Sequence, residues 1–267
     1  APRVRDKRAM RGLLFLASFF VVLGGAPACQ GSPDAARTLD VFAAASLRES
    51  FQTLADAFEA AHPGVTVRLT FAGSQDLRTQ IEHGAAADVF ASADHEPMNA
   101  LLGAKRVEAP AVFAKNRLVI VTPRDNAVVT SLATLPDAKR IVVGAPAVPI
   151  GRYTQRLLEA AAKDPTFGAD FATRVEARIV SREANVRQVL AKVTLGEADA
   201  AVVYRTDAAV AKDVRVVELP RELAFQAEYP IAVVVGSHAP ELARSWVDFV
   251  RSTEGQVTLA RAGFEQP

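Results

Sequence analysis

The chain alternates short apolar runs with amphipathic stretches from residue 38 onward, and this alternation limits its possible folds more than any other feature. Apolar runs of strand length between stretches with helical spacing predict an α/β fold with mainly parallel sheets. We expect helices near residues 46–61, 74–83, 151–162, 185–195 and 239–251. We expect strands at Leu39–Ala44, Val65–Phe71, Val89–Ala91, Leu118–Thr122, Ile141–Gly144, Ile179–Ser181, Ala200–Val203, Val214–Leu219 and Ile231–Val235.

These strands are too numerous for one doubly wound sheet with so few helices. We therefore expect two doubly wound sheets, one in each of two lobes. Extended runs meet a proline at Pro123 and at Pro230, where we expect the chain to cross between the lobes. Residues 38–124 and 226–267 would then form lobe I and residues 125–225 lobe II, joined by a two-strand hinge. A ligand would bind in the cleft between them.

The first 29 residues have the pattern of a secretory signal peptide. Five basic residues precede the apolar run Leu13–Leu23, which is shorter than the roughly 20 residues that a membrane-spanning helix needs. Ala26-Pro27-Ala28 then forms a small-residue cleavage site. Residues 30–37 are rich in small and turn-forming residues and predict a flexible lead-in. We therefore expect a periplasmic or otherwise extracytoplasmic mature protein.

Cys29 follows the cleavage site directly and is the single cysteine of the chain. Two roles for Cys29 remain open. Cleavage just before it would make it the acylated first residue of a lipoprotein. Alternatively, ordinary signal cleavage leaves Cys29 as an inert thiol, an alternative that fits because the three residues before it lack the Leu usual in lipoprotein signals. A single cysteine excludes an internal disulfide framework and a multi-cysteine zinc site. Met10 offers an alternative start for the precursor.

The charge balance argues against a nucleic-acid partner. The whole chain carries 31 Lys and Arg against 30 Asp and Glu, a net charge of +1. Five of the basic residues and one acidic residue lie in the signal segment, so the mature chain has 26 basic and 29 acidic side chains, a formal charge of −3. A nucleic-acid binder needs clustered Lys and Arg to neutralise phosphates.

Two serines stand where a predicted strand gives way to a helix. Ser46 is followed three residues later by Glu49, as in a capping box, so we expect Ser46 to be an N-cap. Ser74 follows Gly73 and is the expected cap of the next helix. Helices after neighbouring parallel strands direct their N-termini, with free N–H groups, to one sheet edge, where an anion can bind. The alternative is that each serine only caps its helix, which contributes about 0.5–2 kcal/mol.

Three positions in the predicted second lobe offer further donors. Pro149 favours the first turn of a helix and leaves the N–H of Ile150 free. Asn185 is the expected cap of another helix, which exposes the N–H of Val186. Tyr204 ends a strand, where it either presents its hydroxyl to the cleft or packs as a core aromatic residue.

Four segments together resemble the periplasmic molybdate- and tungstate-binding proteins of ABC importers: VFAAASL, FAGSQDLRTQIEHGAAADVFASAD, PIGRY and EANVRQVLAKVTLGEADAAVVYRTDA. The resemblance runs from about Leu39 to Phe264 and keeps the order of the motifs. Thirty-six residues separate Ile150 from Val186, and eighteen more lead to Tyr204. The resemblance implies the two-lobed type II periplasmic binding protein fold.

The resemblance also implies a role for five residues. Ser46 and Ser74 would each offer a hydroxyl and a backbone N–H to the oxyanion. Ile150 and Val186 would offer a backbone N–H alone, and Tyr204 its phenolic O–H. Ile150 replaces an Ala common in the family, which should change the pocket volume without removing a donor. No catalytic residue, resident cofactor or metal cation is implied, because molybdenum would be bound as the oxyanion.

The implied partners are a small oxyanion, an ABC permease and its ATPase. We expect a monomer that contacts the membrane only through an anchor at Cys29. Molybdate, tungstate and sulfate are dianions that present only acceptors, so a site made purely of donors suits them. The same fold binding sulfate or another small oxyanion is one alternative. A secreted serine hydrolase using Ser46 or Ser74 is another, although neither serine lies in G-x-S-x-G and no His is placed as its base.

The remaining charged candidates are expected to be structural. Arg48, Arg152 and Arg187 follow proposed donors by one or two residues and should face solvent, with Arg152 close enough to add long-range attraction. Asp88 and Asp94 are expected to support the region near the hinge. The four histidines show no ligand spacing, so no metal site is expected.

Overall fold

The computed structural model describes residues 37–267. The predicted signal peptide, its cleavage site, Cys29 and nearly all of the lead-in lie outside the described residues. Within the described range, no helix combines the length and the apolar character that crossing a membrane requires.

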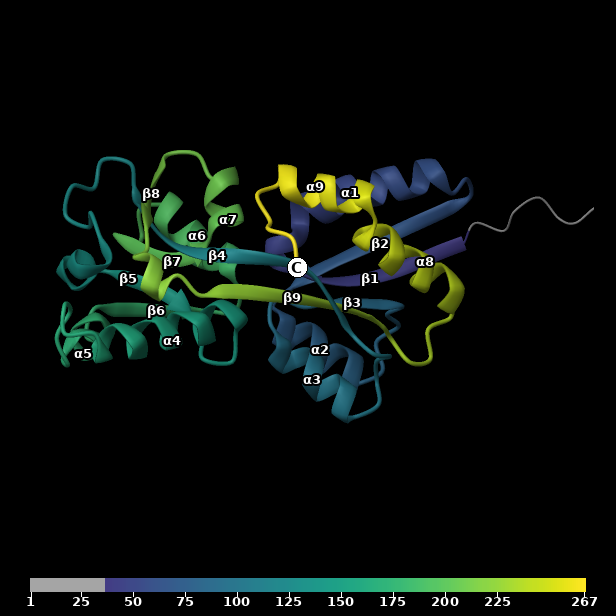
Figure 1. Cartoon of the computed structure of the whole chain (residues 1–267), viewed down its shortest axis with the longest axis horizontal. Coiled ribbons are helices and arrows are strands. Elements are labelled where there is room, and N and C mark those ends of the chain that lie inside the picture. Colours follow the sequence, from purple (N-terminus) through teal and green to yellow (C-terminus); the bar gives the residue numbers. More distant parts are fainter. Residues whose placement is uncertain (1–36) are drawn as a thin grey trace, which may run out of the picture. The chain divides into compact units, whose positions relative to one another are not determined.

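Strands and helices alternate along the described chain, which confirms the α/β prediction (Figure 1). The strands are β1 (Arg37–Ala44), β2 (Val65–Ala72), β3 (Val89–Ala91), β4 (Ala111–Pro123), β5 (Ile141–Gly144), β6 (Ile179–Glu183), β7 (Ala200–Tyr204), β8 (Val214–Glu218) and β9 (Gln226–Val233). The α-helices are α1 (Arg48–Ala61), α2 (Ser74–Glu82), α3 (His95–Gly103), α4 (Pro149–Lys163), α5 (Phe171–Glu176), α6 (Val186–Thr194), α7 (Arg205–Val210), α8 (Pro240–Arg251) and α9 (Thr253–Arg261). Short 3-10 turns lie at Ala45–Leu47, Leu132–Asp137 and Arg221–Leu223.

The strands pair in two groups that share β4. In the first group, β1 is parallel to β2 and β3, and β9 is antiparallel to β3 and to residues 111–117 of β4. In the second group, residues 118–123 of β4 are antiparallel to β7 and β8, and β5 is parallel to β6 and β7. We call the first group with α1–α3, α8 and α9 lobe I, and the second group with α4–α7 lobe II.

β4 begins at Ala111, earlier than the expected start at Leu118. Its first half contains Lys115-Asn116-Arg117, which interrupts the apolar pattern, and this half is a strand because it pairs with β9. Hydrogen-bond partners change between Arg117 and Leu118, so the chain passes between the lobes inside one continuous strand. The predicted lobe boundaries at residues 124 and 226 stay a prediction.

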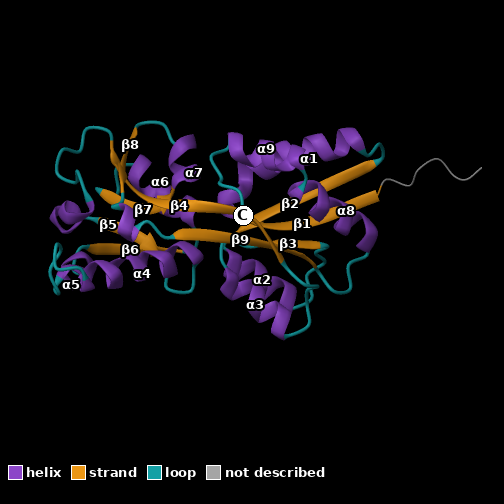
Figure 2. Cartoon of the chain, viewed as in Figure 1, coloured by secondary structure: helices purple, strands orange, loops and turns teal. Residues whose placement is uncertain are grey.

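Helices lie on both faces of the strands in each lobe (Figures 1 and 2). Because side chains alternate across a strand, neighbouring residues of β1 enter different core layers. Val41 joins the main cluster with Phe51 and Leu54 of α1. Phe42 joins a second cluster that includes Leu77 of α2 and residues of α3. The doubly wound arrangement therefore follows from a β1 that is apolar on both faces.

Four helices were not anticipated from the sequence: α3, α5, α7 and α9. Each has six to nine residues. Isolated helices shorter than about 12–15 residues are marginal in water, so packing decides whether they form. Two other nine-residue helices, α2 and α6, were predicted because a serine or asparagine marked each expected start.

Gly151→Ala tests the close packing at the start of α4. A Cβ at this position would lie 2.0 Å from the carbonyl oxygen of Ala145 and 2.6 Å from that of Gly144. Both neighbours are backbone atoms, so relief requires a backbone shift, and we expect the free energy of unfolding to fall by about 1–3 kcal/mol. Urea denaturation measures this change.

Gly103→Ala is the matched control, since Gly103 also lies in a helix but has open space at its Cβ position. It should leave stability unchanged or raise it by up to about 1 kcal/mol through helix propensity. A Gly151→Ala protein as stable as the Gly103→Ala protein would contradict the packing described for α4.

Candidate functional site

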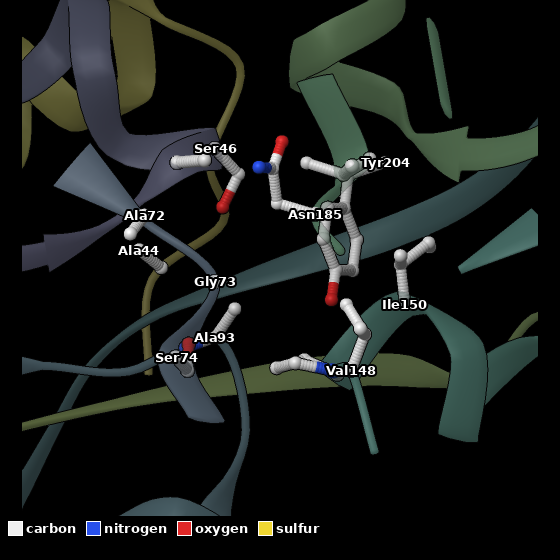
Figure 3. Close-up of a pocket in the computed structure, with 13 residues that line it drawn as sticks. Ala44, Ser46, Ala72, Gly73, Ser74, Ala93, Val148, Ile150, Asn185 and Tyr204 are labelled. Atoms are coloured by element: carbon white, nitrogen blue, oxygen red, sulfur yellow. The ribbon is translucent and has the colours of Figure 1, made fainter. Parts of the chain in front are cut away.

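The five residues predicted to bind a ligand all line one pocket between the lobes (Figure 3). Lobe I supplies Ser46 and Ser74, and lobe II supplies Ile150, Val186 and Tyr204. All five are buried, with 1–4% of each residue exposed. The other lining residues are Ala44, Ala45, Ala72, Gly73, Ala93, Val148, Pro149 and Asn185. No residue of this lining carries a charge, so a ligand in the pocket meets only uncharged polar groups and apolar atoms.

Four of the five residues lie in the first turn of a helix. Ser46 is in the 3-10 turn that precedes α1, and Ser74 is the first residue of α2. Ile150 is the second residue of α4, and Val186 is the first of α6. The N–H groups of a first turn have no partner within their own helix, and the helix start carries a partial positive charge. The turns thus bring four backbone donors to the lining.

The capping predictions for lobe II are confirmed. Asn185 is the N-cap of α6, and its side-chain oxygen accepts hydrogen bonds from the N–H groups of Arg187 and Gln188. Pro149 is the first residue of α4. Both features are local in sequence, which explains why composition and spacing sufficed to find them.

The capping prediction for Ser46 was wrong. The N-cap of α1 is Leu47, and Glu49 does not complete a capping box. The Oγ of Ser46 instead lies 3.1 Å from the phenolic oxygen of Tyr229, on β9. The hydroxyl is therefore held by a contact between distant parts of lobe I, and the capping alternative is removed for this residue.

Ser74 was also wrongly predicted to be a cap. Gly73 takes that position, and the Oγ of Ser74 accepts a hydrogen bond of 3.1 Å from the N–H of Ala93. A hydroxyl that accepts from the backbone still has its own hydrogen to donate. Ser74 therefore adds a second donor beside its backbone N–H.

Tyr229 orients the hydroxyl of Ser46. The Nδ2 of Asn116 donates to the phenolic oxygen of Tyr229 at 3.4 Å and to Oγ1 of Thr206 at 2.8 Å. Either hydroxyl of the Ser46–Tyr229 contact can donate; when Tyr229 donates, the hydrogen of Ser46 is left for the pocket. Sequence reasoning missed this role of Tyr229 and Asn116, because neither residue lines the pocket.

Tyr204 contributes a hydroxyl that has no hydrogen-bond partner among the described residues. It is almost completely buried, and Figure 3 shows the phenol directed into the space between the serines and Ile150. Burial, followed by the proximity of Tyr229, raises the pKa of Tyr204 well above its ordinary value of about 10. Tyr204 is therefore a protonated donor that finds no acceptor among residues 37–267. A buried donor without an acceptor costs about 1–3 kcal/mol.

Two of the three arginines do not face solvent as expected. Nε of Arg152 donates to Oδ2 of Asp94 at 2.7 Å, and Nε of Arg187 lies 2.6 Å from Oδ1 of Asp207. About a quarter of each arginine side chain is exposed. Arg48 is exposed as predicted and lies over the ring of Phe71.

The carboxylates that bind these arginines are perturbed by burial. Burial raises the pKa of Asp207 to about 7, while Arg187 opposes the shift and Glu49 adds to it. Burial likewise raises the pKa of Asp94, with Arg152 opposing. Burial therefore weakens the charge of both carboxyl groups, but each arginine still has a carboxyl partner and neither is a free cation beside the pocket.

A second cluster of ionisable residues has a structural role. Oxygen or nitrogen atoms of Asp40, Asp88 and His238 lie within 4.8 Å of one another. One oxygen of Asp88 accepts from the hydroxyl of Ser237 and the N–H of His238, and the other accepts from the N–H of Asp40. Asp40 forms an ion pair with Arg68. The carboxylates of this cluster therefore already have hydrogen-bond or ion-pair partners within the protein, in agreement with the structural role predicted for Asp88.

The chain is similar to known proteins over nearly the whole of its described length. The family model for bacterial extracellular solute-binding proteins matches residues 39–265. The molybdate-binding protein ModA of Mycobacterium tuberculosis is 39% identical over 243 residues, which cover 89% of this chain and 88% of that protein. A putative ABC transporter substrate-binding lipoprotein of Bacillus subtilis, YvgL, is 30% identical over 260 residues, which cover 94% of this chain and 96% of that protein.

A solved structure has the same fold. The periplasmic molybdate-binding protein of Azotobacter vinelandii superposes with a TM-score of 0.74 at 18% identity, covering 86% of this chain and 99% of that one. The predicted two-lobed α/β fold class is confirmed. The match over residues 39–265 and the relatives of similar length show that this chain belongs to the family of bacterial extracellular solute-binding proteins.

Proposed function

We propose that the protein captures molybdate, and also tungstate, outside the cytoplasm and delivers it to an ABC importer. The observation that carries this proposal is the buried, unpartnered hydroxyl of Tyr204 in a pocket lined by uncharged donors. The name of the Mycobacterium tuberculosis relative supports the choice of ligand. We assign Ser46, Ser74, Ile150, Val186 and Tyr204 as the residues that bind the oxyanion.

The donor set matches the chemistry of a tetrahedral dianion. Four backbone N–H groups and three hydroxyls line the pocket, and a dianion has only acceptors to offer them. Hydrogen bonds to a charged group contribute about 1.5–3 kcal/mol each. Several such bonds suffice for a micromolar dissociation constant, which corresponds to a binding free energy of about −8 kcal/mol. A carboxylate in the lining would oppose binding, and the lining has none.

The size of the pocket favours a single small ion. It is a small pocket with thirteen lining residues, which suits one tetrahedral ion. Sulfate is smaller than molybdate and would not reach all the donors at once, so we propose selection by size. The same fold with sulfate as ligand is the alternative that the experiment below separates.

The remaining parts of the proposal follow from the role of a solute receptor for an importer. We propose that residues 38–124 with 226–267 and residues 125–225 act as two lobes that close on the ion. The partners are then the permease and its ATPase, with no catalytic residue or resident cofactor and with the protein acting as a monomer. Anchoring through Cys29 would agree with the lipoprotein name of the Bacillus subtilis relative.

An oxyanion panel tests the function directly. Molybdate or tungstate at 100 times its dissociation constant should stabilise the protein by about 2.7 kcal/mol and raise its Tm by roughly 5–10 °C. Sulfate and phosphate at the same concentration should raise the Tm by less than about 1 °C, because fewer donors are satisfied. Calorimetric titration and thermal unfolding of the protein measure both effects.

The other outcomes of the panel are informative. A shift with sulfate alone would replace molybdate by the sulfate alternative. The absence of a shift with either metal oxyanion would contradict the proposed ligand. Turnover of a generic ester that Ser46→Ala abolishes would favour the hydrolase instead.

Tyr204→Phe tests the role of the unpartnered hydroxyl. The substitution removes one hydrogen bond to the dianion, so molybdate affinity should fall about 10- to 100-fold. The stability of the ligand-free protein should stay the same or rise, because a buried unsatisfied donor is removed. Tyr153→Phe is the control, since Tyr153 is also buried but lies outside the pocket lining. Equal affinities of the two variants for molybdate would count against Tyr204 as a ligand donor.

The pH dependence of binding follows from the pKa of Tyr204. Because burial raises this pKa well above its ordinary value, the phenol keeps its proton at moderately alkaline pH. The other donors are serine hydroxyls and backbone N–H groups, which do not titrate. Molybdate affinity should therefore be constant between about pH 8 and about 9, above the pKa of about 7 that burial gives Asp207 outside the lining. Calorimetry across this range would contradict the proposed donor set if the affinity fell by tenfold or more.

A further inference from the structure

We propose that two ion pairs between the lobes, Arg187–Glu49 and Arg152–Asp94, are latches that hold the lobes together around the bound ion and set its rate of release. The proposal deepens the proposed function and rests on it for the identity of the ligand. It assigns a role to side chains that do not line the pocket.

The first latch begins at a donor residue of lobe II and ends near a donor residue of lobe I. Arg187 directly follows Val186 at the start of α6, and Glu49 follows Ser46 by three residues in α1. One terminal nitrogen of Arg187 lies 2.9 Å from Oε1 of Glu49, and the other contacts Oε2. This is a bidentate pair, the strongest geometry for an arginine and a carboxylate.

Asp207 holds Arg187 in position from within lobe II. Its Oδ1 lies 2.6 Å from Nε of Arg187, and its side chain is fully buried. The guanidinium is therefore fixed on its own lobe before it meets Glu49, so less side-chain freedom is lost when the pair forms. Asp207 acts as a positioning residue, and Glu49 is the half of the latch that separates when the lobes do.

The second latch lies beside another donor. Arg152 follows Ile150 by two residues in α4, and two of its nitrogens lie 2.7 and 2.6 Å from Oδ2 of Asp94. Glu96 lies 3.6 Å from the same guanidinium. Asp94 directly follows Ala93, whose N–H binds the hydroxyl of Ser74. In each latch, both partners thus lie within one to three residues of a residue that lines the pocket.

The latches and the ligand stabilise the same arrangement of the lobes. Because each arginine lies between two carboxyl groups, a latch adds to closure without placing a free cation near the ion. Removing one partner of a partly buried ion pair acts mainly on dissociation, whereas removing exposed surface charge acts mainly on association. The expected signature is a faster release of ligand at an unchanged association rate.

Glu49→Gln tests the first latch while leaving Arg187 paired with Asp207. Glu49 is 46% exposed at its side chain, so the amide is tolerated at the surface. We expect the molybdate dissociation rate to rise about 3- to 10-fold and the association rate to stay within about twofold. Stopped-flow binding and calorimetry on the full chain measure the two rates and the dissociation constant.

Glu108→Gln is the matched control. Its carboxylate pairs with Arg244 through two nitrogens at similar exposure, but both residues belong to lobe I. It should leave both rates unchanged. A dissociation rate of Glu49→Gln equal to that of Glu108→Gln, or a change confined to the association rate, would overturn the proposal.

A measurement without molybdate separates the latch from the proposed function. Spin labels on cysteines at the exposed positions Asn99 in lobe I and Leu195 in lobe II, with Cys29→Ser, report the distance between the lobes. Glu49→Gln should shift the distance distribution to longer values, and Glu108→Gln should not. If the unaltered protein does not bind molybdate, the proposed function is contradicted. The distance distribution then tests by itself whether the Arg187–Glu49 pair holds the lobes together. An unchanged distribution in Glu49→Gln would then overturn the latch.

Discussion

The site depends on hydrogen-bond donors that the protein buries without satisfying them itself. The hydroxyl of Tyr204 has no acceptor among the described residues, and the first-turn N–H groups at Ser74, Ile150 and Val186 have none within their helices. Leaving such groups buried and unpaired costs free energy, and an acceptor from beyond the described residues would relieve that cost. A dianion with oxygens on all sides does this for several donors at once. The proposed preference for an anion therefore rests on unsatisfied dipoles.

Electrostatic neutrality of the lining is maintained by the residues just outside it. Arg152 and Arg187 stand close to the pocket, and each is paired with a carboxylate, Asp94 or Asp207. A free arginine there would attract every anion alike, and a free carboxylate would repel them all. Pairing the charges leaves hydrogen-bond number and pocket size to discriminate between ions. Arg152–Asp94 and the second pair of Arg187, with Glu49, join the two lobes, so the proposed selectivity and the proposed closing of the lobes share residues.

The strand β4 is one of two segments that link the lobes, and the other runs from β8 to β9. The first half of β4 pairs with β9 and its second half with β7 and β8, so one continuous strand belongs to both strand groups. Tyr229 on β9 and Tyr204 at the end of β7 lie close to this strand, with ring centroids 5.8 Å apart. The hydroxyl of Tyr229 orients Ser46, and that of Tyr204 enters the pocket. Movement about β4 would therefore act directly on the donors.

The sequence by itself determined the features that depend on neighbouring residues. Apolar runs predicted the buried strands, and Pro149 and Asn185 predicted two helix starts, because strand burial and helix capping act over a few residues. The motifs and their spacing, through the family they resemble, also indicated the five residues that line the pocket. Only the tertiary structure decided the partners of the polar side chains. Ser46 contacts a residue 183 positions away instead of capping its helix, and Arg187 reaches across 138 positions to Glu49. Local patterns contain no information about such contacts, since they exist only once folding has brought distant strands and helices together.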